Sequence, residues 1–171
     1  MREIYRREKR KIQFYRWVYM VIVWCIYLVR LMADIPSPYS IHYEERKAIL
    51  LPFKEGWLIF IGIFLLLIIN NVLFFIQEQG KQVYVMEKYI IVPIHKKKLY
   101  NLRVRIFLET IVCFVIGACG IYTVVTIAND CIFSPLILFL SAIKLFSILV
   151  ILMILILVFG SFSQERQFQK K

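Results

Sequence analysis

Residues Gln77 to Arg105, with the sequence QEQGKQVYVMEKYIIVPIHKKKLYNLRVR, form a long polar stretch in a mainly apolar chain. Two long apolar segments precede this stretch and two follow it. It carries seven lysines and arginines against two acids, Glu78 and Glu87. Because loops between packed elements commonly carry function, this stretch is where functional residues are expected first. It also divides the chain into two pairs of apolar segments.

The composition is typical of a membrane protein. Hydrophobic residues make up 61% of the chain, the formal net charge is +11 and the mean hydropathy is +0.72. Soluble domains average about 45–50% apolar residues with charges scattered among them, whereas here the charges are separated from the apolar runs. The basic residues flank these runs at alternate ends. We therefore expect the lipid bilayer as a partner and no nucleic acid.

Four apolar runs predict four transmembrane helices, at residues 17–33, 57–76, 106–128 and 135–162. Each run should be helical because every backbone polar group must be satisfied inside the hydrocarbon. The expected fold is an all-α polytopic bundle over residues 17–162, followed by a polar, basic tail at 163–171. Residues 1–16 are basic and partly aromatic. They form either an amphipathic helix on the membrane surface or a positive anchor that only fixes orientation.

The distribution of lysine and arginine predicts the orientation. The N-terminal segment holds seven, the 77–105 loop seven and the tail three, whereas the two other loops hold three and none. The positive-inside rule then places both termini and the 77–105 loop in the cytosol. We expect a multi-pass protein of the plasma membrane, of bacterial type.

Lys144 is the most unusual polar residue in the predicted spans. It follows Pro135 by nine residues, about 14 Å along a helix and near the middle of a bilayer. An ammonium group there costs about 2.5–3.5 kcal/mol, so it should face a bundle interior, a partner or a cavity. Either it serves transport or partner binding, or it snorkels outward or pairs with an acidic partner subunit for structural reasons.

Other intramembrane polar residues indicate packing. Glu109 is within reach of Arg105 one turn earlier, which predicts a boundary ion pair. Asn70 and Asn71 predict hydrogen bonds between helices. Small residues recur on one face of the third span and predict close helix packing, within the chain or with a partner. These seam residues are Thr110, Cys113, Gly117 and Gly120.

No catalytic motif is present, so we expect no enzyme activity, cofactor or metal. The expected topology separates His42 from His95 by the membrane, and the four cysteines have no metal-binding spacing.

Within the loop, Val83, Met86 and Ile90 recur at helical spacing. They predict a short amphipathic helix over 81–92 that ends before Pro93, because the residue before a proline disfavours the helical region. A strand over Val83 to Val85 is the shorter alternative.

The order of features in the loop resembles the permeases of type-2 ABC exporters. Those proteins have an acidic-glycine segment after the second span, a coupling helix, a proline between apolar residues, a basic pair and a basic residue opening the third span. The matching positions here are Glu78 and Gly80, then 87–92, Val92-Pro93-Ile94, 96–98, and Arg103 or Arg105. The resemblance covers residues 1 to 125. The family usually has six spans, so it implies a shortened permease beside a second membrane subunit or a copy of itself.

The resemblance also implies a soluble ATP-binding subunit that docks on the loop and supplies ATP hydrolysis. The expected docking residues are Val83, Met86, Glu87, Tyr89, Ile90, Pro93, Lys96, Lys97 and Lys98. The alternative function is a non-transporting accessory, regulatory or immunity subunit that packs against another membrane complex.

Overall fold

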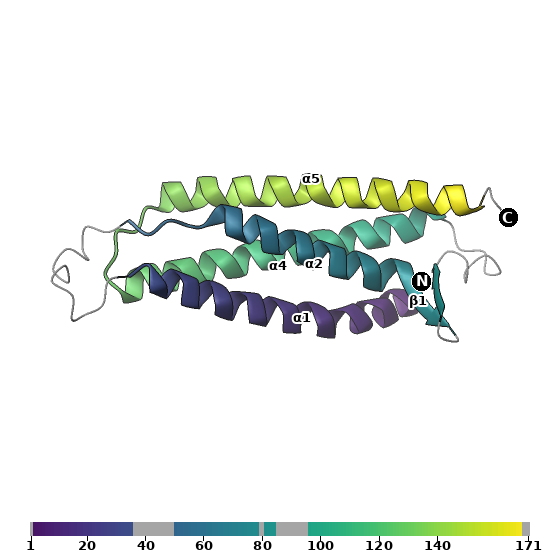
Figure 1. Cartoon of the computed structure of the whole chain (residues 1–171), viewed down its shortest axis with the longest axis horizontal. Helices are drawn as coiled ribbons and strands as arrows, with labels where there is room; N and C mark the ends of the chain where they lie inside the picture. Colours follow the sequence, from purple (N-terminus) through teal and green to yellow (C-terminus); the bar gives the residue numbers. More distant parts are fainter. Residues whose placement is uncertain (1, 36–49, 79–80, 85–95, 169–171) are drawn as a thin grey trace.

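The structure, a computed structural model, describes residues 2–35, 50–78, 81–84 and 96–168. Four helices lie side by side along the long axis of the molecule, and both chain ends lie at the same end of the bundle (Figure 1). The described helices are α1 (Arg2–Ala33), α2 (Glu55–Phe74), α4 (Lys96–Ala128) and α5 (Pro135–Phe168). The expected all-α bundle is confirmed, with a small β hairpin added.

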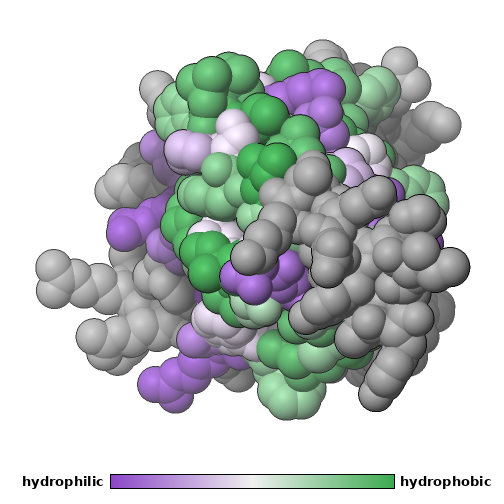
Figure 2. All heavy atoms as spheres, turned by 90° about the vertical axis from the view of Figure 1, so that its left-hand side faces the viewer, coloured by the Kyte–Doolittle hydropathy of each residue, from purple (hydrophilic) through white to green (hydrophobic). Residues whose placement is uncertain are grey.

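Three of these helices are long and apolar enough to cross a membrane. Their apolar stretches are Gln13–Ala33, Arg103–Ala128 and Pro135–Gly160, whereas the described apolar part of α2, Glu55–Asn71, is shorter. Apolar residues also make up much of the surface seen from the end opposite the termini (Figure 2). The chain is therefore compatible with a multi-pass membrane protein.

The interior of the bundle is filled by apolar side chains. Helix α1 packs on α4 and α2, and α5 packs on α2 and α4. Large side chains from three helices are fully buried where these contacts meet, among them Met20, Tyr27, Leu65, Leu66, Phe107 and Phe114. The centre is thus a packed core.

A β hairpin follows α2 where the sequence predicted helix. Strand β1 (Phe75–Glu78) pairs antiparallel with β2 (Lys81–Tyr84), with Phe75 opposite Tyr84 and Ile76 opposite Val83. Aromatic and β-branched residues pair well across strands, and here this pairing prevails over the helical spacing. The expected helix over 81–92 is wrong for its first four residues, and 85–95 lie outside the described residues. The second helix also ends at Phe74, two residues before its expected end.

Helices α1, α4 and α5 extend beyond their predicted apolar runs at the end where the termini lie. Helix α1 runs without interruption from Arg2, so the basic N-terminal residues continue the helix of the first span. Helix α4 begins ten residues before its predicted start and includes Lys96, Lys97 and Lys98 in its first turn.

The small-residue face of α4 meets α1 at one glycine. A Cβ atom at Gly117 would clash with the indole ring of Trp24, whereas a Cβ at Gly120 would have no neighbour within 4 Å. Thr110 is fully buried and donates a 2.8 Å hydrogen bond to the Ile106 carbonyl, and Cys113 is half-buried. Close approach of α1 and α4 therefore depends on Gly117.

These two glycines offer a matched comparison. Gly117→Ala should lower the free energy of unfolding by about 1–2 kcal/mol, because the indole ring of Trp24 must move. Gly120→Ala should not lower it, because alanine favours a helix over glycine by about 0.5–1 kcal/mol. SDS-induced unfolding of the purified chain, followed by tryptophan fluorescence, measures both. Equal midpoints for the two variants would show that Gly117 has no special packing role.

Candidate functional site

The chain enters α2 through an extended segment, Leu50–Lys54, that lies partly inside the bundle. Leu51 and Phe53 are buried, with 2% and 5% of their surface exposed. Pro52 keeps this segment out of the helix, because proline has no N–H and disfavours helix at the preceding residue. At Lys54 the backbone turns with a φ of 55°, and its carbonyl accepts hydrogen bonds from the Trp57 and Leu58 N–H groups. Helix α2 begins at the next residue.

Two tyrosines bind the backbone of this segment. Tyr27 of α1 donates a 2.7 Å hydrogen bond to the Phe53 carbonyl, and Tyr122 of α4 donates one of 2.7 Å to the Leu51 carbonyl. Both hydrogen bonds are buried. Non-helical backbone at membrane depth is tolerated only where protein or water satisfies it. We call Tyr27 and Tyr122 the tyrosine clamp.

Aromatic rings pack around the same hydrogen bonds. The Tyr27 ring stacks on Trp57 with centroids 5.9 Å apart, and Phe53 meets the Tyr122 ring edge-on at 5.4 Å. Each ring supplies apolar contact while the tyrosine hydroxyls reach the carbonyls. The clamp therefore joins α1, α4 and the start of α2 in one packed unit.

Two ion pairs form where the extended segment meets α2. Lys54 Nζ lies 2.8 Å from Asp34 Oδ2 at the end of α1, and Lys144 Nζ of α5 lies 2.8 Å from Glu55 Oε1. Adjacent residues, Lys54 and Glu55, thus bind in opposite directions across the bundle. Glu55 Oε2 is buried and, within the described parts of the chain, has no hydrogen-bond partner.

The Glu55–Lys144 pair lies at the surface of the bundle. The Lys144 side chain is 60% exposed and that of Glu55 is 32% exposed. Ser147 on the same face of α5 is also exposed, and Ser141 is half-buried. Lys144 lies about 14 Å along α5, inside the apolar stretch Pro135–Gly160 that is long enough to cross a membrane.

The sequence interpretation identified Lys144 but missed its partner. Glu55 lies just before the predicted second span, 57–76, but is the first residue of helix α2 in the structure. The available signal was an acid directly before an apolar run, three residues after Pro52. Lys144 pairs within its own chain, an arrangement that was not among the expected alternatives.

The remaining predicted intramembrane residues lie apart from this pair. Arg105 Nε is 3.4 Å from Glu109 Oε1, which is the expected boundary ion pair. Asn70 Oδ1 is buried and accepts no hydrogen bond from the described residues, and Asn71 is exposed. At Asn70 Oδ1, therefore, the structure does not show the expected hydrogen bond between helices.

Two arginines are buried in helices that extend toward the end where the termini lie. Arg103 of α4 is 2% exposed and Arg16 of α1 is 7% exposed. The Arg16 guanidinium lies 5.7 Å from the centre of the Trp17 ring, a cation–π contact. We did not predict burial of either arginine from the sequence, because Arg16 was read only as an orienting charge and Arg103 as a basic residue that opens the third span.

The predicted docking loop is only partly described. Val83 lies in strand β2, and Lys96, Lys97 and Lys98 begin α4. The other five predicted docking residues, Met86, Glu87, Tyr89, Ile90 and Pro93, lie outside the described residues.

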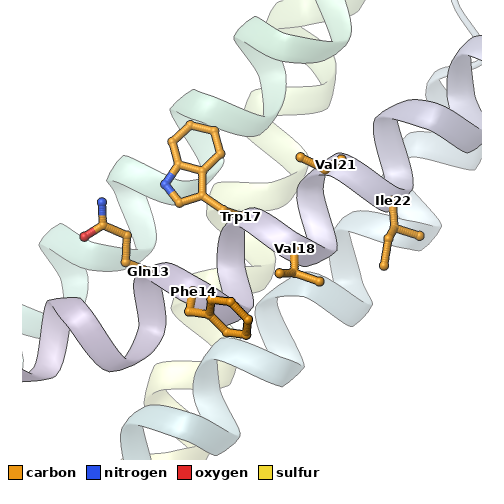
Figure 3. Close-up of a pocket in the computed structure, with 6 residues that line it drawn as sticks. All are labelled: Gln13, Phe14, Trp17, Val18, Val21 and Ile22. Atoms are coloured by element: carbon orange, nitrogen blue, oxygen red, sulfur yellow. The ribbon is translucent and has the colours of Figure 1, made fainter.

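Two open grooves are surface features of single helices. One, of about 480 Å³, follows α1, and Figure 3 shows its lining residues Gln13, Phe14, Trp17, Val18, Val21 and Ile22 on successive turns. The other, of about 460 Å³, follows α4 from Asn101 to Val112. In the described part of the chain no three His, Cys, Asp or Glu residues group to hold a metal ion. Neither groove brings together residues that could carry out catalysis.

The tyrosine clamp can be tested by removing hydroxyl groups. Tyr27→Phe and Tyr122→Phe should each lower the free energy of unfolding by about 1–3 kcal/mol, because each leaves a carbonyl outside any helix without its hydroxyl donor. Tyr19→Phe is the control. Its hydroxyl bonds the Ile61 carbonyl at 3.2 Å, inside helix α2, and its loss should cost only about 0.6 kcal/mol. SDS unfolding of the three variants measures this order, and equal losses would contradict the clamp.

Comparison with known proteins finds no matching family model, and neither a curated protein nor a solved structure shows significant similarity to the chain.

Proposed function

We propose that the chain is a membrane subunit of a transport complex, and specifically of an ATP-driven exporter whose ATPase is a separate subunit. The observation that carries this proposal is the Glu55–Lys144 ion pair beside the extended Leu50–Lys54 segment. Ionisable residues inside membranes mark substrate or ion pathways by default. Interrupted helices in transporters place non-helical backbone and helix ends at such sites.

The proposal includes four crossings of the membrane. Helix α2, Glu55–Phe74, is 20 residues long and rises about 30 Å, close to the thickness of a hydrocarbon core. The extended residues before Lys54, at 50–53, add up to about 13 Å at 3.3 Å per residue. Helix and extended segment together are long enough to complete the second crossing.

The basic end of the bundle is the proposed cytosolic side. Both termini and the β hairpin lie at this end (Figure 1). The three segments richest in lysine and arginine belong to it, which the positive-inside rule assigns to the cytosol. A soluble ATPase would meet the chain here, at the loop whose sequence resembles that of type-2 ABC exporter permeases.

The filled core supports a second candidate function. Apolar side chains occupy the centre of the four helices, so the described part of one chain lines no pathway by itself. A transport pathway would have to form between this chain and another membrane subunit. A non-transporting accessory, regulatory or immunity subunit would need only such an external contact.

Purification from native membranes separates the two candidates. For an exporter, the tagged chain should bring down a subunit with a nucleotide-binding motif and ATPase activity. Changing Met86 and Ile90 together to Asp should reduce its yield by about tenfold, because charges abolish insertion of an apolar face into a groove. The control is Gln167→Asp with Gln169→Asp, which adds the same charge to the tail and should leave the yield unchanged.

An undiminished ATPase yield with the loop variant would refute docking there. Recovery of another membrane complex without any ATPase would favour the accessory role.

A further inference from the structure

Helix α5 is the least covered of the three long apolar helices. Only 17% of its apolar stretch is buried, against 28% and 39% for those of α1 and α4. One face of α5 packs into the bundle through Leu145, Leu149, Met153 and Leu157. The opposite face is open from Ile137 to Val158.

The open face carries a heptad pattern. Exposed residues recur at intervals of three and four: Ile137, Leu140, Lys144, Ser147, Ile151, Ile154 and Val158. Residues at this spacing form the contact seam of two helices that pack side by side with a small crossing angle. We call these seven residues the α5 seam. Lys144 is its one charged member, and a lysine at a single seam position sets register in helix pairs.

Lipid chains could cover the apolar seam residues but cannot satisfy Lys144. Its ammonium group has three donors, and the described structure shows one of them bonded to Glu55 Oε1. Hydrocarbon offers no acceptor, so the exposed part of this pair calls for a protein surface with polar groups at the same depth.

We propose that the α5 seam binds the α5 seam of a second copy of this chain. A two-fold axis along the membrane normal places Lys144 and Glu55 of both copies at the same depth, so the ion pair of one copy lies beside the ion pair of the other. Together with Glu55 of α2, the α5 seam carries one positive and one negative group, so two copies of this surface are complementary in charge. Four alternating charges can then share their ion pairs in a site closed to lipid. This inference rests on the proposed function, for which it names the second membrane subunit.

Disulfide formation between copies tests the seam. Oxidation of Ile151→Cys in native membranes should give about tenfold more covalent dimer than Phe159→Cys, since a disulfide needs Cα atoms within about 7 Å. Phe159 is the matched control, because it is 72% exposed on the same helix but lies off the seam. The wild type, with four free cysteines, sets the background.

Charge exchange tests the identity of the partner. Lys144→Glu and Glu55→Lys chains, given different tags and expressed together, should co-purify with each other about fivefold better than either does with itself, because only the mixed pair is neutral. The proposal would be overturned if the Ile151→Cys variant gave no more covalent dimer than the Phe159→Cys variant. A cross-link from Ile151→Cys to a different protein would also overturn it, although that result would leave the membrane-subunit function intact. If purification from native membranes recovers the Ile151→Cys dimer but no ATPase, the exporter function is refuted and the dimer is supported.

Discussion

The structure depends on how the extended backbone before α2 is satisfied inside the bundle. Within a membrane a carbonyl without a helix partner must find another donor. Tyr27 and Tyr122 provide the hydroxyls for Phe53 and Leu51, and they come from two helices separated by α2 in the sequence. Because both hydroxyls must reach the same short segment, α1, α4 and the start of α2 are held at fixed positions.

The charged residues follow from the same interruption. With α2 starting at Glu55, its carboxylate meets Lys144 on α5, and Lys54 reaches Asp34 on α1. The start of α2 is thereby tied to α1 and α5 as well as to the clamp. The exposed face of the Glu55–Lys144 pair makes α5 the surface on which we propose that a second copy binds.

The sequence predicted correctly those helix ends and contacts that depend on residues close together in the chain. The third helix ends at Ala128 and the fourth begins at Pro135, as expected, because apolar runs are continuous there and proline suits the first helical turn. The ion pair between Arg105 and Glu109, which are one helical turn apart, was also predicted from the sequence. The hairpin was foreseen only as the short strand alternative over Val83 to Val85, because its stability comes from pairing across strands, which helical spacing does not reveal. The Glu55–Lys144 pair joins residues 89 apart, and only the packing of α2 on α5 brings them together.

The most direct test is the coupling energy between Glu55 and Lys144. The free energy of unfolding is measured in bicelles for the wild type, Glu55→Gln, Lys144→Met and the double variant. A pair at membrane depth should show a coupling of about 2 kcal/mol or more, because an unpaired charge near the middle of a membrane-spanning helix costs about 2.5–3.5 kcal/mol. The same cycle on Arg105 and Glu109, where the arginine side chain is 71% exposed, should give only about 0.3–0.5 kcal/mol. A Glu55–Lys144 coupling no larger than that of Arg105–Glu109 would contradict a membrane-embedded ion pair at the start of the second span.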